Sequence, residues 1–113
     1  MHELSIALGI VKIAEDERRK AKATSVDSID LEIGKLSGVE LDSLEFAWPV
    51  AVKDTVLEHA TKNIEVIDGW AKCLECEMEY PVYHAYDGCP ACKSYFKDIL
   101  RGKELRVKSL EVS

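Results

Sequence analysis

Four cysteines constrain the fold of this chain more than any other feature of its sequence. They have the spacing C-x2-C-x12-C-x2-C: Cys73, Cys76, Cys89 and Cys92. Each C-x2-C pair turns the backbone so that both sulfurs point toward one centre, and the twelve residues between the pairs are enough for a hairpin. The spacing therefore predicts two knuckles that hold one tetrahedral metal ion.

Zinc is the metal that these donors favour, and iron stays open as an alternative because four thiolates bind either ion. All four positions are filled by the protein, so we expect a structural site rather than a catalytic one, which would keep a position open for water. Disulfides and a redox dithiol are disfavoured because two such close pairs of reduced thiols chelate a metal. His84 lies between the pairs, and with four thiolates present we expect it to lie outside the ligand set.

The rest of the composition predicts a small globular protein that binds neither nucleic acid nor a membrane. Of the 113 residues, 47% are hydrophobic and 32% are charged, which is enough for a core and a solvated surface. The formal net charge of −6 opposes binding to a phosphate backbone. No apolar run approaches the ~18 residues that a membrane helix needs. The chain begins without a basic leader, so we expect a cytoplasmic protein.

Hydrophobic periodicity predicts two helices and three strands. Apolar residues recur at helical spacing over 4–22 and again from 41 to 51, where we expect Pro49 to kink or split the helix. Alternating apolar and polar residues predict three strands: 26–34, 63–68 and 104–112. The expected fold class is α+β, with two helices packed on a small three-stranded sheet and an inserted zinc-ribbon-like module of two CxxC knuckles.

The cysteine segment is expected to interrupt another domain. Residues 1–68 plus 102–113 would form an α+β domain, and residues 69–101 an inserted zinc-binding domain. The strand at 104–112 should then pair with 26–34 or 63–68 rather than with the zinc module. A segment of about thirty residues buries too little apolar surface to fold alone, so a metal would stabilise it.

The first three residues, Met-His-Glu, offer a second metal site. The α-amino group of Met1, the peptide nitrogen of His2 and the His2 imidazole can close adjacent chelate rings on one ion, and the amide of Glu3 can add a further nitrogen. Nitrogen donors in a plane suit square-planar Ni(II) or Cu(II). The alternative is an ordinary solvated chain end, because three residues are a short motif.

Three stretches together resemble the HypA/HybF family of hydrogenase nickel-maturation proteins: MHELSIA, IGKLSGVELDSLEFAW, and the paired knuckles CLEC and CPAC. The resemblance runs along the whole chain and implies a nickel metallochaperone that is not an enzyme. It implies Ni(II) as cargo on Met1, His2 and Glu3, with structural Zn(II) on the four cysteines. Glu40 matches a position near the nickel site where relatives have an acidic side chain, which is a softer assignment.

The resemblance also implies partners. These are a nickel-maturation GTPase of the HypB type and the large subunit of a [NiFe] hydrogenase, and the chain itself would be a monomer or a weak homodimer. Whether urease is also supplied stays open. The rival interpretations are a zinc-ribbon interaction module, which would not depend on His2, and a hydrolytic metalloenzyme, for which no nucleophile–base pair is visible.

Overall fold

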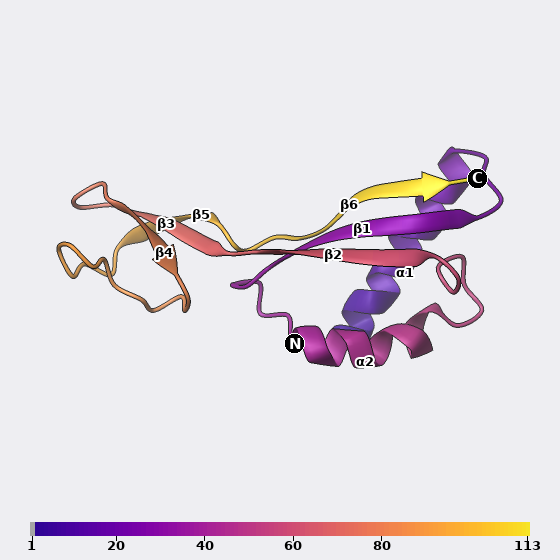
Figure 1. The fold of residues 1–113 in the computed structure, drawn as a ribbon, viewed down its shortest axis with the longest axis horizontal. Helices are drawn as coiled ribbons and strands as arrows, with labels where there is room; N and C mark the ends of the chain where they lie inside the picture. Colours follow the sequence, from indigo (N-terminus) through magenta and orange to yellow (C-terminus); the bar gives the residue numbers. More distant parts are fainter. Residues whose placement is uncertain (1) are drawn as a thin grey trace. The chain divides into compact units, whose positions relative to one another are not determined.

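The computed structural model describes residues 2–113, which form two helices and two small three-stranded sheets (Figure 1). In chain order the elements are α1 (Glu3–Lys20), β1 (Val26–Gly34), α2 (Leu41–Val52), β2 (Thr61–Ile67), β3 (Gly69–Cys73), β4 (Glu79–Val82), β5 (Lys97–Arg101) and β6 (Leu105–Val112). The sheets have the strand orders β2-β1-β6 and β4-β3-β5. The expected α+β class is confirmed, and β6 pairs with β1 as predicted.

The chain divides into two compact units, and each is made of separate segments. Unit 1 comprises the chain up to Leu31, Val39–Glu65 and Arg106–Ser113, and unit 2 comprises Glu32–Gly38 and Val66–Leu105. The expected α+β domain, 1–68 with 102–113, is discontinuous like unit 1, whereas the expected inserted domain, 69–101, is one continuous segment. The bounds of both domains as folding units stay a prediction. Within the described residues, neither helix has the length and hydropathy needed to cross a membrane.

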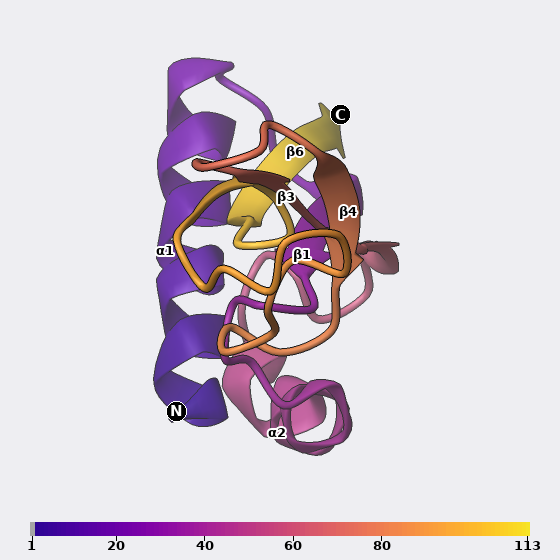
Figure 2. The same ribbon diagram turned by 90° about the vertical axis from the view of Figure 1, so that its left-hand side faces the viewer.

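The core of unit 1 lies between its helices and its sheet. Its buried side chains come from α1 (Ala7, Ile10, Val11, Ala14), α2 (Leu44, Trp48, Ala51, Val52) and β1 (Val26, Ile29, Leu31). The helices pack against each other, and α1 lies along one face of the sheet (Figures 1 and 2). The other face is polar: Asp30 accepts hydrogen bonds from Asn63 (2.9 Å) and Ser109 (2.7 Å). One buried and one polar face explain the alternation in the sequence.

Two expectations about the helices are corrected. α1 ends at Lys20, two residues earlier than expected, and Lys22 has a φ of 55°. This left-handed conformation cannot continue a right-handed helix. α2 runs through Pro49 as one helix, so the expected split there is wrong. Pro49 is exposed and lies in the last turn, where its missing N–H removes only one helical hydrogen bond.

Three backbone segments of unit 2 approach one another at glycines. A Cβ placed on Gly34 would lie 1.9 Å from the carbonyl oxygen of Gly102, and one on Gly102 would lie 2.6 Å from the Cα of Gly69. Gly102 also has a φ of 114°, which residues with side chains rarely adopt. The N–H of Leu36 donates to the Gly102 carbonyl at 2.7 Å. Glycine is therefore required here by space as well as by conformation.

We expect Gly34→Ala to lower the free energy of unfolding by about 1–3 kcal/mol, because a methyl group cannot fit against the Gly102 carbonyl unless the backbone moves. Urea denaturation followed by circular dichroism measures the change. Gly9→Ala is the matched control, since nothing lies within 4 Å of a Cβ at Gly9 and the substitution favours the helix by ~1 kcal/mol. Equal effects of the two substitutions would contradict the close approach at Gly34.

Candidate metal centres

Two knuckles with the same backbone geometry carry the four cysteines of unit 2. The first follows β3, which ends at Cys73, and the second lies in the loop before β5. In each, the residue after the second cysteine donates its N–H to the carbonyl of the first: Glu77 to Cys73 (3.0 Å) and Lys93 to Cys89 (2.9 Å). The φ angles of Glu77 and Lys93 are 65° and 66°. Two non-glycine residues in this uncommon conformation mark the segments as equivalent turns.

The four sulfurs form one group. The Sγ atoms of Cys73 and Cys92 lie 3.5 Å apart, and those of Cys76 and Cys89 lie 3.6 Å apart, so the short distances join the two knuckles. All four Sγ atoms lie within 4.8 Å of one another, and none is in a disulfide. A tetrahedral ion with Zn–S bonds of about 2.3 Å requires sulfurs about 3.8 Å apart. A disulfide requires about 2.05 Å. The spacing therefore fits a four-thiolate metal site.

Backbone amides favour the thiolate form of the first cysteine in each pair. The N–H of Cys76 donates to the Sγ of Cys73 at 3.4 Å and lowers the pKa of that thiol to about 7. The N–H of Cys92 likewise lowers the pKa of Cys89. Thiolates rather than thiols bind metals, so the turns themselves prepare two of the four ligands.

The first cysteine of each pair also belongs to the apolar core of unit 2. The buried cluster comprises Ala71, Cys73, Tyr80, Val82 and Cys89. Cys76 and Cys92, in contrast, are exposed. The Tyr80 hydroxyl is buried and has no hydrogen-bond partner among the described residues, and this burial raises the pKa of Tyr80. Because two ligands belong to so small a core, metal binding and folding of unit 2 should depend on each other.

Contacts of Asp87 order the loop that leads to the second knuckle. The Asp87 carboxylate accepts N–H bonds from Tyr83 (2.8 Å) and His84 (3.0 Å), which lower its pKa. The Nζ of Lys97 donates to the Asp87 carbonyl at 2.8 Å. The His84 ring stacks on Tyr86 and lies outside the four-sulfur group. The positions of Asp87 and Tyr80 near the candidate site were not predicted from the sequence. The turn-forming pair Asp-Gly at 87–88 was the available signal for Asp87.

His2 and Glu3 lie at the start of α1, and Glu3 contacts the residue before α2. His2 is exposed, precedes the first helical residue, and makes no capping hydrogen bond with its side chain. Glu3 begins α1, and its carboxylate accepts the N–H of Glu40 at 3.2 Å. Glu40 is the residue before α2. This contact brings Glu40 next to the motif, while Met1 lies outside the described residues.

Main-chain nitrogens at the start of α1 are available to bind a metal ion. The first N–H groups of a helix have no acceptor within it, and the hydrogen bond from Ile6 N–H to the His2 carbonyl (3.1 Å) closes the first turn. Within residues 2–113, the four cysteines are the only close group of three or more metal-binding side chains. A metal at the chain start would therefore need main-chain nitrogens in addition to the His2 imidazole.

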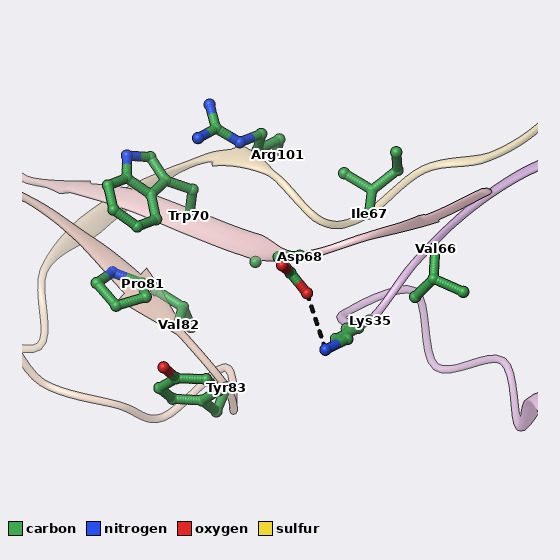
Figure 3. Close-up of a pocket in the computed structure, with 10 residues that line it drawn as sticks. Lys35, Val66, Ile67, Asp68, Trp70, Pro81, Val82, Tyr83 and Arg101 are labelled. Atoms are coloured by element: carbon green, nitrogen blue, oxygen red, sulfur yellow. Dashed lines mark ion pairs between the residues drawn. The ribbon is translucent and has the colours of Figure 1, made fainter.

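A pocket of about 490 Å³ in unit 2 is lined by none of the candidate metal ligands (Figure 3). Trp70 and Tyr83 belong to its lining, and the Arg101 guanidinium lies over the Trp70 ring, 5.3 Å from its centroid. Lys35 and Asp68 form an ion pair across 2.8 Å (Figure 3). The lining holds no cysteine, histidine or serine.

Comparison with known proteins gives a consistent result. The family described as hydrogenase/urease nickel incorporation, metallochaperone, HypA matches residues 1–112. The hydrogenase maturation factor HypA of Parabacteroides distasonis is 46% identical over 112 residues, which are 99% of this chain and 97% of that protein. The protein of the same name from Geobacter metallireducens is 44% identical, with 99% of each covered. The solution structure of the Ni metallochaperone HypA from Helicobacter pylori shares the fold, with a TM-score of 0.71 at 24% identity over 99% of this chain and 97% of that chain.

Proposed function

Because this chain belongs to the HypA family of nickel-incorporation metallochaperones, we propose that it takes up Ni(II) at its N-terminus and delivers the ion during maturation of a [NiFe] hydrogenase. Urease is a second destination in a host that makes it. A member of this family is a metal carrier and not an enzyme. The observation that best supports the N-terminal site is the exposed His2 imidazole beside helix-start amides that form no helical hydrogen bond.

The proposed nickel donors are nitrogen atoms. The Met1 α-amine, the His2 amide and imidazole, and the Glu3 amide can close adjacent chelate rings around a planar ion. Glu40 would contribute a nearby carboxylate. Copper binds such nitrogens more tightly than nickel does, so selectivity must come from geometry and from the protein that exchanges the ion. An exposed chain end suits a cargo that has to be released.

We further propose that the four cysteines hold a structural zinc ion. The sulfur spacing and the two low-pKa thiols suit this ion, which would join the two knuckles of unit 2. A shell of four thiolates leaves no position for water or substrate, so the zinc would stabilise the fold and take no part in catalysis.

A carrier needs proteins that supply and accept the ion. We propose a nickel-maturation GTPase of the HypB type and the large subunit of the hydrogenase as these partners. The cytoplasm is the compartment that suits this role, because it keeps the four thiols reduced.

Counting metals on protein with a native N-terminus tests both sites. Protein dialysed against Ni(II) and Zn(II) should carry one zinc and one nickel per chain by inductively coupled plasma mass spectrometry. Zinc without nickel would contradict the cargo assignment. Iron at the cysteines in protein made with ample zinc would overturn the structural-zinc assignment.

A further inference from the structure

The hydroxyl group of Tyr80 is enclosed in the core of unit 2 without a hydrogen-bond partner among the described residues. Tyr80 is only 2% exposed, so water does not reach the hydroxyl either. A hydroxyl buried in this way costs free energy, and phenylalanine would fill the same space without the cost. A buried tyrosine is therefore expected to use its hydroxyl for a specific partner.

Tyr80 lies beside the two buried cysteines of the candidate zinc site. In the antiparallel pair of β3 and β4, Tyr80 is opposite Ala71, and Cys73 follows two residues later on the same face of the sheet. Such diagonal neighbours across a strand pair are within reach of an aromatic side chain. Tyr80 also shares one buried cluster with Cys73 and Cys89. The partner is therefore to be sought among the buried ligands.

A zinc site of four thiolates needs hydrogen-bond donors. The thiolates outweigh the charge of the divalent ion, so the loaded site is negative, and two of its sulfurs are buried. Backbone N–H groups already serve these two: Cys76 donates to Cys73 at 3.4 Å, and Cys92 donates to Cys89. The Tyr80 hydroxyl adds a side-chain donor in the same core. Burial raises its pKa and the charges of three of the cysteines raise it further, so its proton is retained.

We infer that the Tyr80 hydroxyl donates a hydrogen bond to a buried thiolate of the metal site, that of Cys73 or Cys89, and thereby strengthens zinc binding. The inference rests on the proposed structural zinc. The short sulfur distances of 3.5 and 3.6 Å lie below the ~3.8 Å that a tetrahedral zinc site requires, so the sulfurs shift when an ion enters. The hydroxyl proton can follow, because it turns about the C–O bond. Tyr80 is thus a positioning residue that acts through a ligand.

The two possible roles of the hydroxyl predict different effects of Tyr80→Phe. If the hydroxyl has no partner in the zinc-loaded protein, its removal leaves the zinc affinity unchanged or raises it, because the ring still fills the core. If the hydroxyl donates to a thiolate, its removal leaves a buried negative charge with one donor fewer. The zinc affinity should then fall about tenfold or more, which is typical for the loss of a group that supports a metal ligand.

The test measures zinc affinity of the full chain by competition with a chromophoric chelator. Tyr95→Phe is the matched control, because Tyr95 is also in unit 2 but is 70% exposed, and its affinity should stay within about twofold of the unmodified protein. Cadmium NMR spectroscopy of the Cd(II)-substituted proteins provides a readout that packing alone would not move. The cadmium resonance, which responds to the charge on the sulfurs, should shift in Tyr80→Phe and keep its position in Tyr95→Phe.

Either an affinity of Tyr80→Phe within about twofold of the unmodified protein or an unmoved cadmium resonance would overturn the inference. A weaker affinity accompanied by altered amide signals throughout residues 66–105 of the zinc-loaded variant would also overturn it, because the effect would then come from misfolding of unit 2. Failure of the proposed zinc site is a separate result: unmodified protein that binds no zinc refutes the site itself. If zinc is bound equally by all three proteins, only the role of Tyr80 is refuted.

Discussion

Acetylation of the Met1 α-amine should weaken nickel binding about as much as His2→Ala does. If the α-amine is a ligand, an acetyl group at that position replaces its basic lone pair with a non-basic amide. Each change should lower nickel affinity on the order of 100-fold, because donors of the chelate are lost. Zinc content and thermal stability should stay unchanged, since His2 is exposed and contributes no packing. Calorimetric titration with Ni(II) measures the affinity, and metal analysis measures the zinc.

The chain offers a matched control for this experiment. His59 is also in unit 1, and its side chain is 93% exposed, so His59→Ala removes an imidazole without touching the motif. Its nickel affinity should equal that of the unmodified protein. Glu3→Gln and Glu40→Gln should have smaller effects than His2→Ala, because carboxylates are weaker ligands for this ion than the nitrogens. Equal affinities of the acetylated, His2→Ala and unmodified proteins would reduce the motif to an ordinary helix start.

Cys73→Ser should remove the zinc and unfold unit 2 while unit 1 keeps its helices. Cys73 is both a proposed ligand and a buried member of the small core that includes Tyr80 and Val82, so the substitution weakens the metal site and the packing together. The core of unit 1 contains none of these residues. A colorimetric zinc assay and amide NMR spectra should show loss of the metal and collapse of the signals from residues 66–105. Signals from α1 and α2 should persist.

Cys92→Ser provides the comparison for this result. Cys92 is exposed, so Cys92→Ser should release zinc to a similar extent. In the absence of metal, the packing of unit 2 should resemble that of the unmodified apoprotein more closely in Cys92→Ser than in Cys73→Ser. A Cys73→Ser protein that retains one zinc per chain, or an unchanged spectrum for unit 2, would contradict the four-thiolate assignment.

The elements of unit 1 could be predicted because they are long enough to show several periods. The buried positions of α1 follow i, i+3, i+4 and i+7 from Ala7 to Ala14, and β1 alternates apolar and acidic residues from Ile29 to Ile33. The sheet β4-β3-β5 was missed, because strands of four or five residues contain barely two alternations. Cys73 also occupies a buried strand position in β3, and the metal-ligand role expected from its spacing drew attention away from this strand pattern.

The two candidate sites differ in how far the sequence could define them. The cysteine cluster follows from local spacing, because each knuckle closes within six residues. The contact between Glu3 and Glu40 joins residues 37 positions apart. It depends on how α1 packs against α2, which periodicity alone does not specify. The exposure of Phe46 in α2 was missed for the same reason, since an apolar residue in a helical stretch is expected to be buried.

The connectivity of the chain bears on how such a protein can change over generations. The backbone passes between the two units four times, next to Leu31, Gly38, Glu65 and Leu105. Neither unit is therefore encoded by one continuous stretch of gene. Recombination that moved unit 2 into another protein would have to transfer two segments and restore every junction. The two candidate metal sites are consequently inherited together. Each site can change through substitution of single residues, and exchange of a whole unit with another protein is not an easy route.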